Sequence, residues 1–72
     1  MLTERLRRAI VKVYVRFDIP ADHVVCDALL AGHFADLVNE EVGPDEYYSA
    51  TAINHALLYL RKRGGMPRLV RP

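Results

Sequence analysis

Three stretches of helical periodicity, separated by residues that break helices, constrain this chain more than any other feature. In the first stretch, apolar residues such as Leu6, Ile10 and Val13 recur at steps of three and four, which places them on one helix face. Pro20 and Gly43-Pro44 interrupt the pattern, because Pro cannot continue a helix and Gly commonly ends one. The sequence therefore predicts an all-α domain, a three-helix bundle with helices at about 3–17, 20–42 and 46–64 and an extended basic C-terminal tail at 65–72.

The first stretch also contains a competing strand pattern. Residues 10–17 alternate apolar and polar side chains and are rich in valine, a composition that favours β-structure. The helical periodicity covers a longer segment, and Thr3 is a suitable N-cap for it. We therefore expect a helix over this stretch, with a strand at 10–17 as the alternative.

The second stretch has one face of large residues and one of small residues. The large face carries Cys26, Leu30, His33, Phe34 and Leu37. Ala28, Gly32 and Ala35 lie on the other face, and a Gly inside a helix costs about 1 kcal/mol relative to Ala. We expect a neighbour to approach closely over this small face, either the first helix or a second copy of the chain in a homodimer.

The size of the chain makes partner association a realistic expectation. A chain of 72 residues buries a small core, which alone rarely supplies more than about 3–5 kcal/mol of stability. Cys26 is the only cysteine, so no disulfide can form within the chain. The expected core combines the inward residues of the three helices, namely Leu6, Ile10, Val13, Phe17, Leu30, Phe34, Leu37, Ile53, Leu57 and Leu60.

Charge is segregated along the chain. Apart from Glu4, all Asp and Glu residues lie between Asp18 and Glu46, a segment that contains no Lys or Arg. In one interpretation the basic ends form surface ion pairs with the acidic middle, each worth about 0–1 kcal/mol. In the other, a basic surface binds an anionic partner. Both interpretations are compatible with the sequence.

The third stretch resembles the recognition helix of winged helix-turn-helix DNA-binding domains. The resemblance covers residues 49–71 and rests on the spacing of Thr51, Ile53, Leu57, Leu60 and Gly64. It implies a helix-turn-helix-like fold and a DNA-binding or regulatory function, in which the start of this helix faces base edges in the major groove. The residues implied to contact duplex DNA are Thr51, Asn54 and His55 at the bases and Arg61, Lys62, Arg63, Arg68 and Arg71 at phosphates.

A protein-interaction module with no nucleic-acid role is the alternative function. Leu58 falls on the outer side of the third helix together with Thr51 and His55, where an apolar side chain suits a protein contact better than a phosphate-rich groove. Tyr48, Leu58 and Tyr59 would supply the amphipathic contact area for a partner.

Other classes of function find little support in the sequence. His23, Cys26 and Asp27 fall on one helical side, but Cys26 lies among valines and leucines, and we expect no metal and no cofactor. The chain has no phosphate-binding glycine loop and no nucleophile elbow, so we expect no enzymatic activity. It has no apolar run near the roughly 20 residues needed to span a bilayer. We therefore expect a cytoplasmic protein without membrane association.

Overall fold

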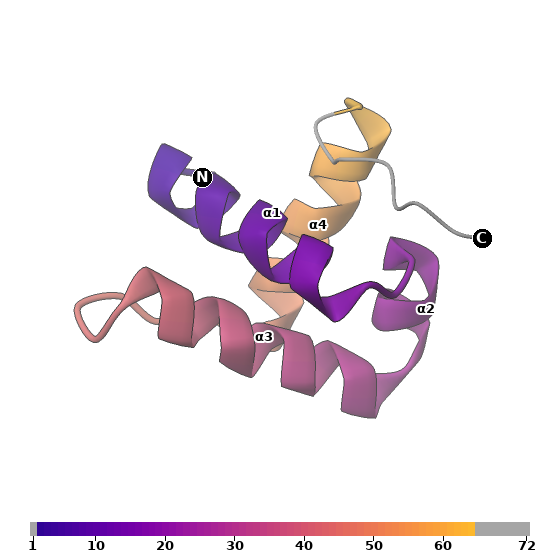
Figure 1. Cartoon of the computed structure of the whole chain (residues 1–72), viewed down its shortest axis with the longest axis horizontal. Coiled ribbons are helices and arrows are strands. Elements are labelled where there is room, and N and C mark those ends of the chain that lie inside the picture. The colour runs from indigo at the N-terminus through magenta and orange to yellow at the C-terminus, as the bar shows by residue number, and fades with distance from the viewer. Residues whose placement is uncertain (1, 65–72) are drawn as a thin grey trace.

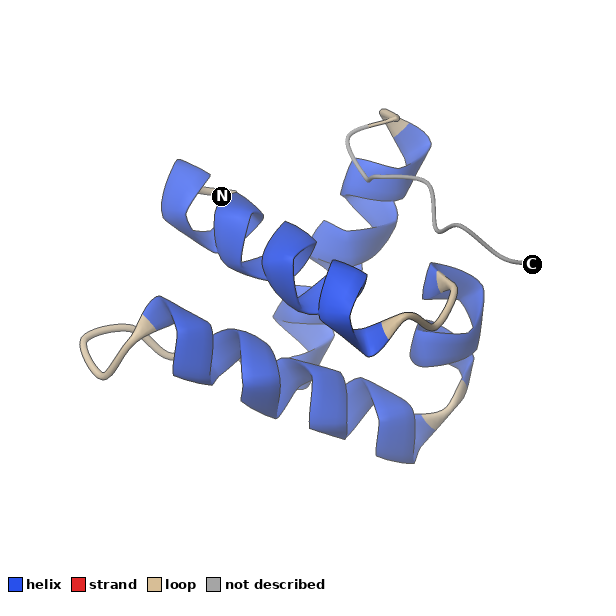
Figure 2. Ribbon diagram, in the orientation of Figure 1, coloured by secondary structure: helices blue, strands red, loops and turns tan. Residues whose placement is uncertain are grey.

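The computed structural model describes residues 2–64 and folds this part of the chain into helices without a strand (Figures 1 and 2). The helices are α1 (Glu4–Phe17), α2 (Ala21–Cys26), α3 (Ala28–Val42) and α4 (Ala50–Lys62). In Figure 1, α1 lies above α3, α4 crosses behind them, and α2 closes the end where α1 leads into α3. The all-α prediction is confirmed for these residues, with four helices in place of the predicted three. The predicted tail, with Arg68 and Arg71, lies outside the described residues.

The first stretch is a helix along its whole length. The Thr3 hydroxyl accepts a hydrogen bond from the Leu6 amide at 3.1 Å, so the predicted N-cap is confirmed. Leu6, Ile10 and Val13 are buried, whereas Val15 is 52% exposed. The strand alternative is wrong because the inward residues follow the helical period along the entire stretch.

The second stretch is divided, which corrects the single helix predicted for residues 20–42. Asp27 has an extended backbone and separates α2 from α3. Its carboxylate accepts hydrogen bonds from the amides of Leu29 and Leu30 at 2.9 and 3.2 Å. This is N-cap geometry, and a capping Asp favours the start of a new helix over the continuation of an old one.

The third helix starts later than the predicted residue 46. The Asn39 side chain donates to the Tyr48 carbonyl and accepts from the Tyr48 amide, both at 2.9 Å, which holds residues 43–49 as a loop. Ser49 then caps α4 by accepting from the Ala52 amide at 3.1 Å. A side chain that binds both backbone groups of Tyr48 removes them from any helix that could begin earlier.

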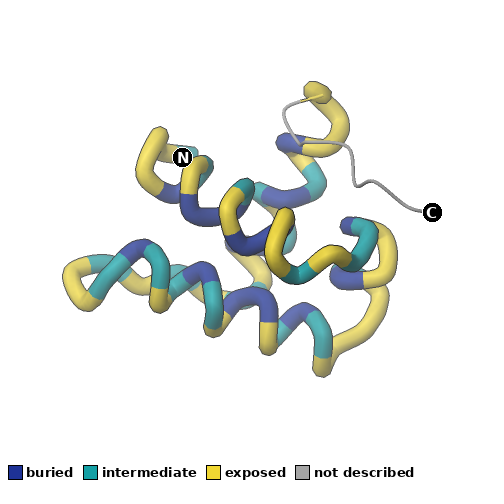
Figure 3. Tube along the Cα trace, in the orientation of Figure 1, coloured by how far each residue is buried: buried dark blue, intermediate teal, exposed yellow. Residues whose placement is uncertain are grey.

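The core lies where α1, α3 and α4 meet. Of the predicted core, Leu6, Ile10, Val13, Phe34, Ile53, Leu57 and Leu60 are buried, whereas Phe17, Leu30 and Leu37 are only partly buried. The α3 face that turns inward is rotated from the prediction and presents Ala31, Phe34, Ala35 and Val38. Figure 3 shows the turns of α3 that face away from α1 as exposed. The break at Asp27 also removes Cys26 from this helix.

Candidate functional site

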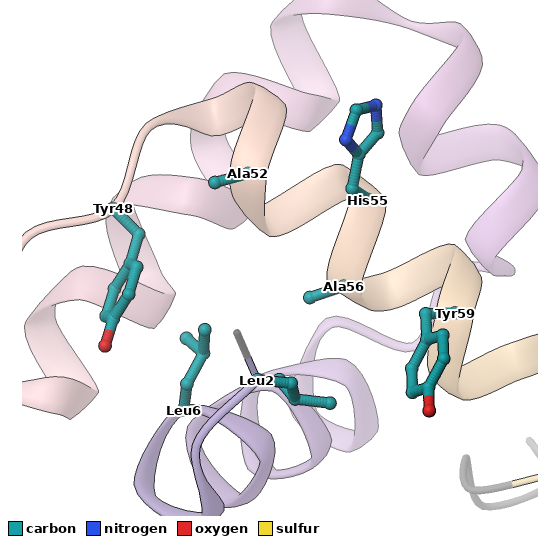
Figure 4. Close-up of a pocket in the computed structure, with 7 residues that line it drawn as sticks. All are labelled: Leu2, Leu6, Tyr48, Ala52, His55, Ala56 and Tyr59. Atoms are coloured by element: carbon teal, nitrogen blue, oxygen red, sulfur yellow. The ribbon is translucent and has the colours of Figure 1, made fainter.

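An open apolar groove of about 710 Å³ runs between the start of α1 and one side of α4. Figure 4 shows Leu2, just before α1, and Leu6 of α1 opposite Ala52 and Ala56 of α4, with a tyrosine at each end. The residues that line the groove are Leu2, Leu6, Tyr48, Ala52, His55, Ala56 and Tyr59. The space exists because α4 places two alanines where longer side chains would reach Leu2 and Leu6.

Tyr48 forms one end of the groove and is held firmly in place. Both of its backbone polar groups bind Asn39, as described above. Its hydroxyl group donates a hydrogen bond to Glu46 at 3.1 Å. Glu46 in turn pairs with Arg5 of α1 at 3.4 Å. This end of the groove is therefore preorganised, which lowers the ordering cost of any binding there.

Tyr59 forms the other end and is more open. Its side chain is 49% exposed, and the guanidinium of Arg63 lies 5.5 Å from its ring centroid, within the range of a cation–π contact. An aromatic ring with a polar tip at the edge of an apolar surface is typical of residues that anchor protein contacts. This end combines apolar area with positive charge.

The lining of the groove suits binding better than catalysis. Leucines and alanines form its floor, and His55 points away from the two leucines in Figure 4. Among the lining residues that the structure describes there is no Ser, Cys, Asp or Glu. In residues 2–64, no three His, Cys, Asp or Glu side chains gather closely enough to hold a metal ion.

Two of the three predicted partner-binding residues line the groove. Tyr48 and Tyr59 lie at its ends, whereas Leu58 is half-buried and does not line it. The prediction missed Leu2 and Leu6 as well as Ala52 and Ala56. The available signal was the pair of alanines four residues apart, followed by Tyr59 after three more, because residues at this spacing share one side of a helix.

The predicted base-reading residues are not equally accessible. Thr51 and His55 are exposed on α4. Asn54 is half-buried, and its side-chain oxygen is buried without a hydrogen-bond partner among the described residues. Asn54 therefore faces the protein more than the solvent, and the structure does not bring it together with Thr51 and His55 on one outer surface.

The predicted phosphate-binding residues differ in whether they are already paired with a carboxylate. Arg61 pairs with Asp22 of α2 at 2.7 Å. Lys62 and Arg63 are exposed, and neither pairs with a carboxylate within residues 2–64. Arg68 and Arg71 lie outside the described residues. Among the described members of this set, Lys62 and Arg63 are exposed at the end of α4, where an anionic partner could reach them.

Ion pairs between helices link the basic and acidic parts of the chain. Lys12 of α1 lies 3.1 Å from Glu41 of α3, and Arg5 also donates to the Val42 carbonyl at the end of α3 at 2.7 Å. With the pairs Arg5–Glu46 and Arg61–Asp22, these contacts neutralise part of the segregated charge within the molecule. Surface pairs of this kind contribute about 0–1 kcal/mol each.

The predicted homodimer surface is not a single exposed face. Ala28 is exposed and Gly32 is half-buried, but Ala35 is only 4% exposed and packs in the core. A Cβ atom at Gly32 would have no atom within 4 Å, apart from the nearby backbone of its own helix. The first helix therefore does not approach closely over Gly32.

At the start of α1, the pKa of the Glu4 carboxyl group is clearly shifted. Arg7 donates to Glu4 at 2.8 Å, and this hydrogen bond holds the pKa of Glu4 below its ordinary value. The positive charges of Arg7 and Arg8 act in the same direction. Glu4 lies outside the groove, so the shift reports local stabilisation of the start of α1.

None of the helices in residues 2–64 combines the length and the apolar character that crossing a bilayer requires.

Comparisons with protein-family models, with curated proteins and with solved structures find no match to this chain.

Proposed function

We propose that this domain is a protein-interaction module that binds an apolar segment of a polypeptide in the groove between α1 and α4. The observation that carries the proposal is an apolar groove that stays open beside a well-packed core. Leu57 and Ile53 of α4 are fully buried, yet Ala52 and Tyr59 of the same helix remain exposed beside Leu2. An amphipathic helix that places two or three bulky side chains in such a groove is a common mode of recognition.

The chemistry of the lining favours a polypeptide over a nucleic acid. The floor is aliphatic, so a phosphate backbone would gain little there. The polar groups are few and lie at the edges, where tyrosine hydroxyls and Arg63 would set the orientation of a partner. Interfaces with an apolar centre and a polar rim are typical of protein–protein contacts.

Selection from a displayed library of random helical peptides would test this proposal. The full chain serves as bait, and the variant Ala56→Arg serves for counter-selection because it places a long charged side chain in the groove. Val15→Arg is the matched control, since Val15 is exposed on α1 and does not line the groove.

We expect the enriched peptides to carry apolar residues at three- and four-residue spacing. They should bind the wild type and Val15→Arg equally, and Ala56→Arg about tenfold or more weakly, equivalent to about 1.4 kcal/mol. Peptides that bind Ala56→Arg as tightly as the wild type would contradict a role for this groove.

DNA binding is a second candidate, favoured by one observation. Thr51, His55 and Lys62 are all exposed along one side of α4, with Arg63 beside them. Fluorescence anisotropy with labelled duplex DNA would test it. If the domain binds DNA, Lys62→Ala should weaken binding to all sequences and reduce the salt slope by about 0.9. The absence of binding at low salt would remove this candidate.

A further inference from the structure

We propose that the groove is filled by the outer face of α3 from a second copy of this chain, so that copies associate head to tail. This inference rests on the proposed function, because it names the polypeptide segment that the groove binds. The groove lies between α1 and α4, whereas the outer face of α3 points away from α1 (Figures 1 and 3). Two different surfaces that bind each other form a heterologous contact, which leaves a free surface at each end.

The outer face of α3 combines apolar and acidic side chains. Leu29 is 85% exposed, the highest value among the large apolar residues of the described chain. His33 and the half-buried Leu37 follow it at four-residue steps. Asp36 and Glu40 are exposed on the same side, and within residues 2–64 neither pairs with a cation. The face is therefore an amphipathic helix surface with free negative charge.

The groove carries the complementary charge at one end. Arg63 lies against Tyr59, and Lys62 is its exposed neighbour. At the opposite end, the charge of Glu46 is already paired with Arg5. The side chains of Lys62 and Arg63 therefore give this end of the groove exposed positive charge, which would attract a carboxylate of an incoming helix.

The spacing of the two surfaces agrees when the incoming α3 runs parallel to α4. Leu29 and Leu37 are separated by about 12 Å along a helix axis, and Ala52 and Tyr59 by about 10.5 Å. If Leu29 enters beside Ala52, Leu37 reaches the Tyr59 end. Glu40 then follows Leu37 by about one turn, as Arg63 follows Tyr59, so that these opposite charges meet.

Charge also distinguishes this occupant from the chain's own C-terminal residues. Residues 65–72 contain Arg68 and Arg71 and no acid. In the groove they would bring like charge to Lys62 and Arg63, which is unfavourable. The outer face of α3 carries negative charge, which is opposite to the charge of Lys62 and Arg63. Association would also add buried area to a domain whose single small core provides limited stability.

Sedimentation of the full-length chain over a range of concentrations tests the proposal. We expect the average mass of the wild type to rise with concentration beyond that of a dimer, since a head-to-tail contact does not stop at two copies unless it closes into a ring. Ala56→Arg blocks the groove and Leu29→Lys blocks the α3 face, so each variant alone should remain a monomer. Far-UV circular dichroism should show both variants folded, and Val15→Arg should associate like the wild type.

The most decisive experiment mixes the two blocked variants, Ala56→Arg and Leu29→Lys. Each retains the surface that the other has lost, so an equimolar mixture should form 1:1 dimers and nothing larger. Glu40→Arg should weaken self-association of the wild type about tenfold or more, and adding Arg63→Glu in the same chain should restore it.

Three results would overturn the proposal. They are a wild type that stays monomeric at every concentration, association that survives both blocking variants, and a mixture that fails to form dimers. If the wild type is monomeric but selected peptides still bind the groove, the proposed function stands and only the second copy is wrong as its occupant. If the wild type is monomeric and the selected peptides also bind Ala56→Arg as tightly as the wild type, both proposals fail.

Discussion

The two interfaces of α1 differ in how completely they close. Against α3, α1 buries Ile10 and Val13 next to Phe34 and Val38, and all four are at most 1% exposed. Lys12–Glu41 and the hydrogen bond from Arg5 to Val42 span the edge of this interface. Against α4, the start of α1 meets alanines and leaves the groove. The same helix thus forms a closed interface with α3 and, at its start, leaves an open groove where the opposing residues of α4 are alanines.

This comparison separates residues that hold the fold from residues that are free to bind. A buried side chain with many neighbours cannot change without a cost in free energy of unfolding. A side chain at the edge of an open groove changes with little cost, because solvent or a partner replaces its neighbours. Substitutions in the two regions should therefore have different effects on stability.

The largest loss of stability is expected for Phe34→Ala, in the closed region. Phe34 is fully buried and lies edge-to-face with Phe17, with ring centroids 5.6 Å apart. Removing its ring should cost about 3–5 kcal/mol, comparable to the whole stability of a domain of this size. Far-UV circular dichroism should show a largely unfolded chain, and a cooperative transition near the wild-type temperature would contradict the assigned core.

A smaller loss is expected for Asn39→Ala, which frees the fixed end of the groove. The substitution leaves both backbone polar groups of Tyr48 without their partner and should cost about 1–3 kcal/mol. Asn54→Ala is the matched control, because the buried oxygen of Asn54 has no hydrogen-bond partner in the described part of the chain. It should change stability by less than about 0.5 kcal/mol. Chemical denaturation would compare the two variants, and equal losses would contradict the role given to Asn39.

Two alanine-to-leucine substitutions compare the closed and open regions directly. Ala35→Leu adds volume to the packed core and should cost about 1–3 kcal/mol. Ala56→Leu extends into the groove and should change the free energy of unfolding by less than about 0.5 kcal/mol. Thermal or urea unfolding measures both. A loss at Ala56 as large as that at Ala35 would mean that the groove is closed in solution.

The smallest effect is expected from the pH dependence of Glu4 at the start of α1. Its pKa is lowered in the folded state, chiefly by the hydrogen bond from Arg7. Its contribution is therefore present above the ordinary pKa of 4.5 and is lost as pH falls through the lower folded value. Glu4→Gln should slightly flatten the decrease in melting temperature between about pH 6 and about pH 3. A variant that matches the wild type throughout this range would contradict the shift.

The sequence predicted the helices better than their boundaries and faces. The periodicity of residues such as Leu6, Ile10, Leu57 and Leu60 is enough to identify α1 and the inward side of α4. The break at Asp27 depends on whether the Asp27 side chain caps a new helix or the old helix continues. The spacing of apolar residues does not indicate which of the two occurs. The hydrogen bonds between Asn39 and Tyr48 join a residue near the end of α3 to one in the following loop, and no local sequence pattern indicates this pairing.

The candidate site was only partly predictable for a related reason. Tyr48 and Tyr59 could be selected as large amphipathic residues near the start and the end of one helix. The groove itself depends on Leu2 and Leu6 lying opposite Ala52 and Ala56, which is a property of how α1 packs against α4. Likewise, the pairing of Arg61 with Asp22 depends on the position of α2 as a separate helix.

Methyl-resolved NMR of the full chain tests most directly whether the open interface is the binding surface. Upon titration with a selected peptide, the methyl signals of Leu2, Leu6, Ala52 and Ala56 should shift, whereas those of Val13 and Val38 in the closed interface should stay in place. Shifts confined to residues outside the groove, or no shifts at saturating peptide, would contradict the account.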